Sequence, residues 1–64
     1  MTTFIELKDY ATDRVVVINK DAIISVSHHP YLAGAVVKLL YNSEFHIAES
    51  VEEIIAEING VNNA

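Results

Sequence analysis

Residues 50–60 form the segment whose pattern most restricts the fold, because it has the hydrophobic periodicity of an α-helix. Val51, Ile54, Ile55 and Ile58 occupy positions i, i+3, i+4 and i+7, which places them along one stripe of a helix. The rest of the 64-residue chain is divided into short apolar runs separated by turn-forming residues. The pattern therefore predicts a single amphipathic helix at the C-terminal end of a domain otherwise built from strands.

The two ends of this helix carry signals of their own. Ser50 is followed three residues later by Glu53, which is the spacing of a capping box. Gly60 is of the residue type that most often ends helices in a left-handed conformation. We therefore expect a short helix that begins after Ser50 and ends before Gly60. Glu52, Glu53 and Glu57 are expected on the side opposite the apolar stripe.

Five short apolar runs precede the helix and are rich in Val and Ile, which favour β-strands. Residues 19–22 predict a tight turn or a short helical turn between the second and third runs. Residues 28–34 predict a loop, because Pro30 has no backbone N–H and Gly34 tolerates left-handed angles. The five runs cover residues 3–8, 14–18, 23–27, 35–41 and 45–48.

This order of elements predicts an α+β fold. We expect a small curled antiparallel sheet of about five strands followed by one C-terminal amphipathic helix. The chain shows neither an internal repeat nor a linker, so a single domain over residues 1–64 is predicted.

The hairpin between the last two runs has two candidate registers. A two-residue loop would place Lys38 opposite Ile47, whereas a three-residue loop pairs Tyr41 with Phe45 and Leu39 with Ile47. The second register gives one continuous apolar face, so we prefer it. It requires Ser43 or Glu44 to adopt a left-handed conformation.

The chain contains no cysteine, which excludes disulfides and cysteine-based zinc sites as sources of stability. A domain of this size buries only about 60% of the surface that its unfolded chain exposes. Small domains are usually supported by disulfides, a metal ion or oligomerisation. Three sources of stability remain here: a well-packed core, a metal site made of histidines and carboxylates, or self-association.

Negative charge is concentrated after Lys38, which is the last basic residue of the chain. The formal net charge is −5, and five glutamates follow this lysine. Such a surface repels phosphate backbones and anionic membranes, so we expect neither nucleic-acid nor membrane binding. The acidic side chains either keep the protein soluble, bind a basic protein partner, or imitate the charge of nucleic acid as a small inhibitor does. The candidate partner-binding residues are Glu49, Glu52, Glu53 and Glu57.

The distribution of apolar residues also indicates where in the cell the protein is located. No apolar run approaches the roughly 20 residues of a membrane-spanning helix. The first residues lack the basic and apolar regions of a signal peptide. We therefore expect a cytoplasmic protein.

Two of the three histidines, His28 and His29, lie in the predicted loop, and His46 lies in the last predicted strand. Adjacent histidines in a strand point to opposite faces, and the three lack the spacing of a zinc-binding motif. We therefore predict a polar bend, with no bound metal and no cofactor. If the loop has a binding role, its candidate residues are His28, His29 and Tyr31.

The sequence lacks the usual signs of a catalytic site. None of the serines has the flanking glycines of a nucleophile elbow, and two glycines are too few for a phosphate-binding loop. Carboxylates on a solvated helix are not desolvated enough to act as general acids. We therefore predict that the protein is not an enzyme.

The strands carry more apolar side chains than one helix can cover. Hydrophobic residues make up 52% of the chain, against a usual ~45–50%. Either the sheet curls into a small barrel with the helix across one opening, or its second face forms a subunit interface. The second explanation predicts a homo-oligomer, most simply a dimer. Its candidate interface residues are Val16, Ile18, Val36 and Leu40.

The last fifty or so residues contain a recognisable order of features. A strand ending in Asn is followed by a short turn, an Ile-rich strand, a hairpin, and a strand that runs into Glu-Ser and an acidic helix. The positions concerned are Ile18, Asn19, Ile23, Val26, Leu40, Asn42, Glu49, Ser50, Val51, Glu52, Glu53 and Ile54. In this order the chain resembles the small flagellar and swarming-motility protein family. The resemblance implies a small non-enzymatic accessory protein and supplies no catalytic residues.

Two functions of different classes remain open. The first is a small cytoplasmic non-enzymatic interaction module that self-associates and binds a protein partner. The alternative is a small inhibitor or ligand-sequestering protein, of the type that mobile elements carry. In that case residues 28–34 of adjacent subunits would form the pocket between them.

Overall fold

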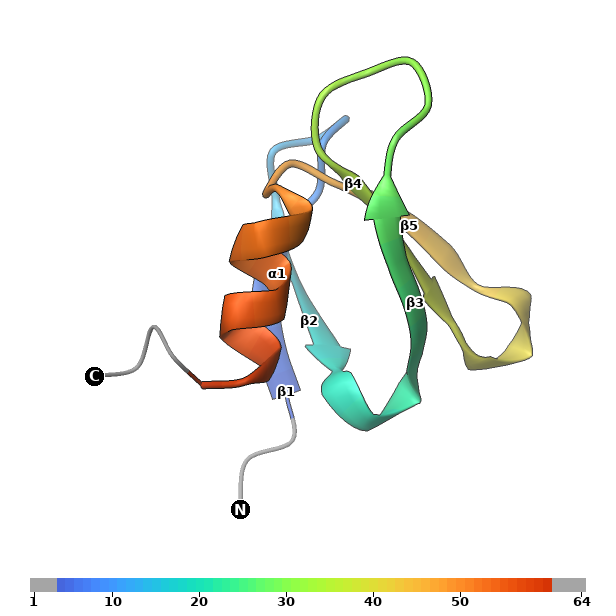
Figure 1. Cartoon of the computed structure of the whole chain (residues 1–64), viewed down its shortest axis with the longest axis vertical. Helices are drawn as coiled ribbons and strands as arrows, with labels where there is room; N and C mark the ends of the chain where they lie inside the picture. The colour runs from blue at the N-terminus through green and yellow to red at the C-terminus, as the bar shows by residue number, and fades with distance from the viewer. Residues whose placement is uncertain (1–3, 61–64) are drawn as a thin grey trace.

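The computed structural model describes residues 4–60, which form five β-strands followed by one α-helix (Figure 1). The α+β fold is therefore confirmed. Short 3-10 turns at Lys20–Ala22 and Leu40–Asn42 connect β2 to β3 and β4 to β5. Of the first predicted strand, Thr3 lies outside the described residues. The elements are β1 (Phe4–Lys8), β2 (Val15–Asn19), β3 (Ile23–His28), β4 (Ala35–Leu39), β5 (Glu44–Ile47) and α1 (Val51–Ile58).

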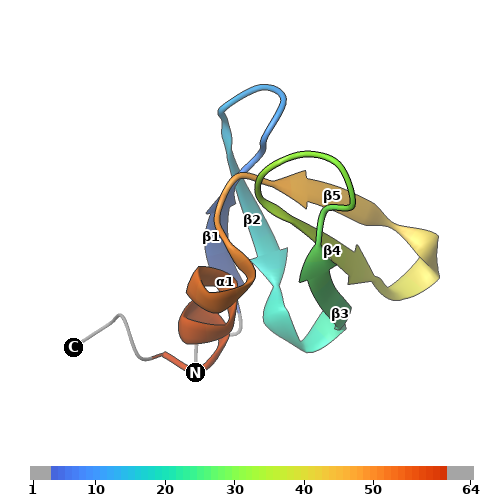
Figure 2. The same ribbon diagram turned by 45° about the horizontal axis from the view of Figure 1, so that its top comes forward.

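The five strands form two antiparallel sheets rather than the one continuous sheet predicted. β1 pairs with β2, and β3, β4 and β5 form a three-stranded meander. The ends of β1 and β5 join the two sheets through a bridge between Asp9 and Ile47. Beside it, Tyr10 N donates to His46 O at 2.9 Å, and Ala48 N donates to Lys8 O at 2.7 Å. These bonds curl the strands around a shared interior, as Figure 2 shows.

The core lies between the curled strands and α1, which packs against β1 and β3. In β1 the inward residues Ile5 and Leu7 alternate with exposed ones, as expected for a strand with one buried face. Ile54 is the residue of α1 that is fully enclosed. The buried core consists of Ile5, Leu7, Ile18, Ala35, Val37, Ile47 and Ile54.

The predicted ends of the helix are confirmed. Ser50 Oγ accepts a hydrogen bond from Glu53 N at 3.1 Å, and Ser50 N donates to Glu53 Oε1 at 2.9 Å. Gly60 has a positive φ of 73°, and its N–H donates to Glu57 O at 3.1 Å. Ile55 was expected on the buried side of the helix but is exposed. The side of the helix that contacts the core carries Val51, Ile54 and Ile58, and Ile55 lies beside it.

The predicted register of the β4–β5 hairpin is wrong by four residues. Phe45 lies opposite Val37 rather than Tyr41, and Lys38 lies opposite Glu44, with 3.8 Å between Lys38 Nζ and Glu44 Oε2. The left-handed residues are Tyr41 and Asn42, so the chain turns earlier than predicted and Tyr41 is almost fully exposed. Because an even shift preserves the alternation of side chains, the inward face is nevertheless the predicted one.

Candidate functional site

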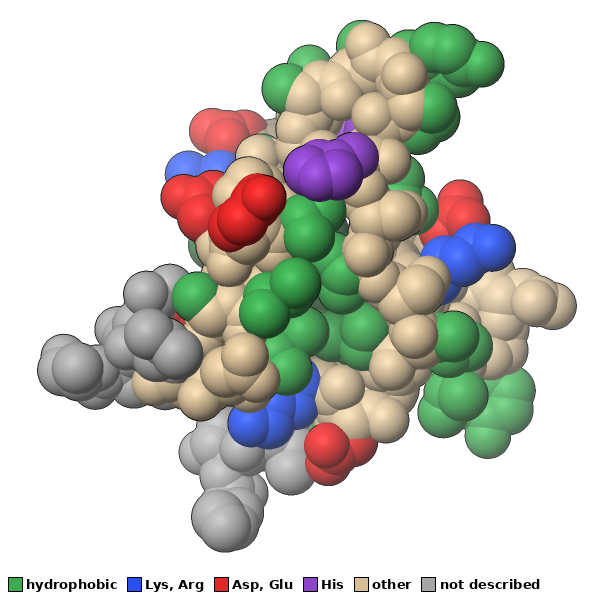
Figure 3. All heavy atoms as spheres, in the orientation of Figure 1, with side chains coloured by type: hydrophobic (Ala, Val, Ile, Leu, Met, Phe, Trp, Pro, Cys, Tyr) green, Lys and Arg blue, Asp and Glu red, His purple; other side chains and the backbone are tan. Residues whose placement is uncertain are grey.

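Two loops, residues 9–14 and residues 29–34, lie at the same end of the molecule (Figures 1 and 2). The turn that leads from β5 into α1 lies at this end too. The bridge between Asp9, just past the end of β1, and Ile47 brings these segments together, although residues 10 and 46 are far apart in the sequence. Figure 3 shows histidine side chains below the upper loop, close to acidic side chains. We call residues 9–14, 29–34 and 46–50 the loop end.

A stack of rings occupies the loop end. The ring of His46 lies between those of Tyr10 and His29, with centroid distances of 4.1 Å and 4.2 Å. The interplanar angles are 13° and 24°, so both contacts are stacked. Tyr31 meets His29 edge-on at 6.4 Å. His29 and Tyr31, both predicted candidates, are therefore brought together, whereas His28 lies exposed at the end of β3.

The imidazole nitrogens in this stack bind the backbone of the β3–β4 loop. His29 Nδ1 accepts hydrogen bonds from Tyr31 N at 3.1 Å and from Leu32 N at 3.0 Å. His46 Nε2 lies 2.9 Å from Ala33 O. A carbonyl oxygen only accepts, so His46 Nε2 carries a proton and donates it. Since His29 Nδ1 accepts two N–H groups, the neutral His29 ring carries its proton on Nε2.

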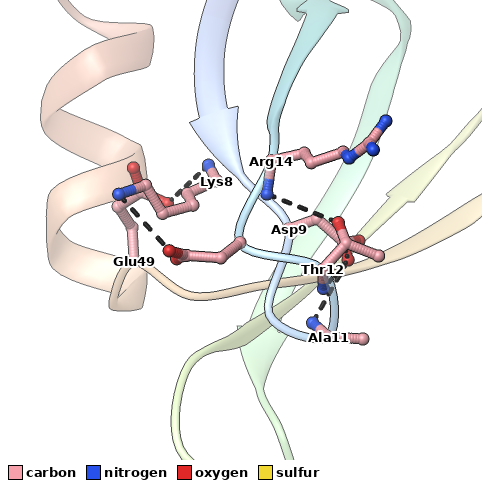
Figure 4. Close-up of polar contacts among 7 residues, drawn as sticks. Lys8, Asp9, Ala11, Thr12, Arg14 and Glu49 are labelled. Atoms are coloured by element: carbon pink, nitrogen blue, oxygen red, sulfur yellow. Dashed lines mark hydrogen bonds and ion pairs between the residues drawn. The ribbon is translucent and has the colours of Figure 1, made fainter.

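The β1–β2 loop is held by a carboxylate in the same way (Figure 4). Asp9 Oδ2 accepts from Ala11 N at 3.1 Å, from Thr12 N at 2.9 Å and from Thr12 Oγ1 at 3.1 Å. The backbone hydrogen bond from Thr12, followed by that from its hydroxyl group, lowers the pKa of the Asp9 carboxyl group below its ordinary value. Asp9 and His29 therefore perform equivalent structural roles in neighbouring loops.

The stack could not be found from the sequence alone. Tyr10 and His46 meet only because the chain just after β1 bridges to the end of β5, and no local pattern indicates this contact. His46 lies on the outer face of β5 and is half-buried by neighbouring rings.

Neither a metal cluster nor a pocket is formed by residues 4–60. No three histidine or acidic side chains in this range are placed to hold a metal ion. The surface of the same range is not hollowed into a pocket. Within one described chain, the loop end is therefore a ring-covered surface rather than a cavity.

Two of the four candidate acidic residues have structural roles. Glu49 Oε1 accepts a hydrogen bond from Lys8 N at 2.9 Å, which ties the start of the helical segment to β1 (Figure 4). Glu53 closes the capping box. Glu52 is exposed and Glu57 is half-buried, and the described residues give neither side chain a hydrogen bond or an ion pair. These two carboxylates are the ones available to a partner.

The expectation that Ile18 is exposed at an interface is wrong. Ile18 lies opposite Ile5 and is buried in the core, and Val16 lies opposite Leu7 and packs against the same core. Val36 is half-buried on the outer face of β4. Among the four predicted interface residues, Leu40 is the one that is well exposed.

The opposite face of β1–β2 carries the exposed apolar side chains instead. Val15 and Val17 are 60% and 61% exposed, and Phe4, on the same face of β1, is 57% exposed. The sequence does not show which residues of β2 point outward, because every residue from Val15 to Ile18 is apolar and suits either face. We call this surface the hairpin face, and it consists of Phe4, Glu6, Lys8, Val15, Val17 and Asn19.

Residues 4–60 contain no helix with the length and apolar character needed to cross a membrane. Comparisons with protein-family models, with curated proteins and with solved structures find no match to this chain. The resemblance to the flagellar and swarming-motility family therefore stays a prediction.

Proposed function

We propose that this chain is a small non-enzymatic interaction module that pairs with a second copy of itself and binds a protein partner. The observation that carries the proposal is the hairpin face, where Phe4, Val15 and Val17 are each more than half exposed. Nothing in the described part of the chain packs over this face. Grouped apolar side chains on a small protein are typical of protein–protein contacts.

The charges of the hairpin face favour a second copy as its occupant. Glu6 lies opposite Val17, and Lys8 lies opposite Val15, so one acid and one base flank the apolar residues. A two-fold axis places the same patch of both copies in contact. If the strands of the two copies run antiparallel, Glu6 of one copy faces Lys8 of the other. The face is therefore complementary to itself in apolar character. Lys8 Nζ already lies 3.8 Å from Asp13 Oδ1 of its own chain, so Glu6 of the second copy would share this lysine with Asp13.

Self-association also supplies stability that a chain of this size lacks. β1–β2 is a two-stranded hairpin, which on its own is marginally stable in water. Its inner face packs on the core, whereas among residues 4–60 of a single copy nothing covers its outer face. Covering the outer face with a second hairpin removes that apolar surface from water. The interface then stabilises the whole domain without a disulfide or a metal ion.

For the further partner we propose a basic protein surface. Glu52 and Glu57 lie on a helix without a basic residue, and the chain has no lysine or arginine after Lys38. In a dimer joined through the hairpin faces, each copy keeps its own α1 and its own loop end. The alternative of a ligand pocket at the loop end is less well supported, since the rings stack on one another and their nitrogens bind backbone.

Sedimentation velocity on two matched variants tests the self-association. Val17→Lys places a charge in the hairpin face, whereas Ile24→Lys places one in β3 at a site that is 62% exposed, against 61% for Val17. We expect Val17→Lys to sediment as a monomer and Ile24→Lys to keep the wild-type mass. Equal behaviour of the two variants would contradict the proposed face. A bound small molecule found by native mass spectrometry would favour the ligand-sequestering alternative.

A further inference from the structure

The β3–β4 loop is fixed by imidazole groups. In the described part of the chain, the hydrogen bonds of residues 30–33 all end on histidine rings: two on His29 Nδ1 and one on His46 Nε2. One weaker backbone bond, from His29 N to Gly34 O at 3.4 Å, closes the base of the loop. The conformation of the loop therefore depends on which ring nitrogens carry protons.

His29 and Asp9 form the same local hydrogen-bond pattern with different chemistry. Each side chain accepts from the backbone N–H groups two and three residues later, at Ala11 and Thr12 in one loop and at residues 31 and 32 in the other. A carboxylate keeps accepting throughout the neutral range. An imidazole nitrogen loses its lone pair on protonation, and histidine titrates between about pH 5 and 8.

We propose that the β3–β4 loop is a pH-sensitive clasp, in which neutral His29 holds Tyr31 and Leu32, and protonation of His29 at Nδ1 releases them. The protonated Nδ1 is a donor and would face two backbone N–H groups that are donors too. A proton on Nδ1 is therefore compatible with the open loop and not with the closed loop. By linkage, falling pH shifts the population toward the open loop.

The groups around His29 either disfavour a charge on its ring or are occupied by other contacts. His46, from β5, lies against one face of the ring, and a charge on it would repel a second charge on His29. Tyr31 meets the ring edge-on from the same loop, and Tyr10 covers the far side of His46. Asp9 lies near enough to His46 for their charges to interact. Asp9 is itself engaged with the backbone and the hydroxyl group of its own loop.

Release would change the surface that the loop end presents. Tyr31 and Leu32 are exposed side chains at the tip, held in one backbone conformation by His29. An open loop presents the same side chains on a mobile segment and frees one face of His46. The clasp goes beyond the proposed self-association, because the hairpin face lies on other strands and contains no histidine.

Amide hydrogen exchange by NMR on the full-length chain tests the clasp. The protection of Tyr31 and Leu32 N–H, relative to the intrinsic exchange rate at each pH, is measured from about pH 8 to pH 5. We expect it to fall by up to about tenfold per pH unit once the imidazole titrates. The N–H groups of Ala11 and Thr12, which Asp9 holds, serve as an internal control and should stay protected.

Two variants separate the role of His29 from that of its neighbour. Asn at position 29 can accept the same two N–H groups through Oδ1 and does not titrate, so His29→Asn should remove the pH dependence and keep the loop closed. His28→Asn alters an exposed neighbour and should behave as wild type. Protection of Tyr31 and Leu32 that is equal at pH 8 and pH 5 would overturn the proposal. An unchanged pH dependence in His29→Asn would overturn it too.

Discussion

Ile5 and Ile18 lie directly opposite each other on the inner face of the β1–β2 hairpin, and both are buried in the core. Since neighbouring residues of a strand point to opposite faces, this pair fixes the outward direction of Phe4 and Val17. The position of the proposed interface therefore follows from the packing of the core.

Ile18→Ala is expected to destabilise the fold without changing the oligomeric state of the molecules that remain folded. Truncating a buried isoleucine usually costs about 2–5 kcal/mol of unfolding free energy. Urea denaturation measures the loss, and light scattering on the folded fraction measures the mass. A variant that keeps its stability but dissociates would place Ile18 in the interface rather than in the core.

Ser50→Ala is expected to lower the free energy of unfolding by about 0.5–2 kcal/mol, because it removes the oxygen that caps α1. The helix has only eight residues and depends on such contacts. Ser27→Ala, at an exposed position in β3, is the matched control and should change little. Equal denaturation midpoints for the two variants would show that the capping box contributes nothing.

Gly34→Ala is expected to destabilise the fold by more than about 1 kcal/mol. Gly34 has a φ of 88°, and a Cβ at this position would collide with the backbone carbonyl oxygen of Ile47. The carbonyl belongs to a core strand and cannot move freely. A midpoint of thermal unfolding equal to that of wild type would contradict this close approach of the β3–β4 loop to β5.

Asp9 is expected to stabilise the fold above its ordinary pKa of 3.8 and to lose this effect in acid. Its folded pKa is lowered, chiefly by Thr12, so the unfolded chain binds a proton more readily and falling pH favours unfolding. The stability difference between wild type and Asp9→Ala should therefore shrink as pH drops below 3.8. Urea midpoints from neutral pH to pH 3 measure it, and a difference that grows in acid would contradict the assignment.

Features that depend on local sequence were predictable. The capping box needs only Ser50 and Glu53 at the right spacing, and Pro30 and Gly34 are enough to predict a loop. The strands were recognised for the same reason, since each is a short run of β-favouring residues between turns.

Features that depend on distant contacts were not predictable. Every residue from Val15 to Ile18 is apolar, so the pattern does not choose which face of β2 enters the core. Pairing with β1 decides it, through Ile5 and Leu7. The ring stack likewise requires β1 and β5 to meet, which places Tyr10 on His46.

The molar mass of the wild-type chain in solution tests the proposed self-association most directly. Light scattering on a size-exclusion column, at ~10–100 μM protein, detects any dimer with a dissociation constant well below this range. We predict a mass of twice the 7.1 kDa of one chain at neutral pH. A mass of 7.1 kDa throughout this concentration range would contradict the proposed pairing of hairpin faces.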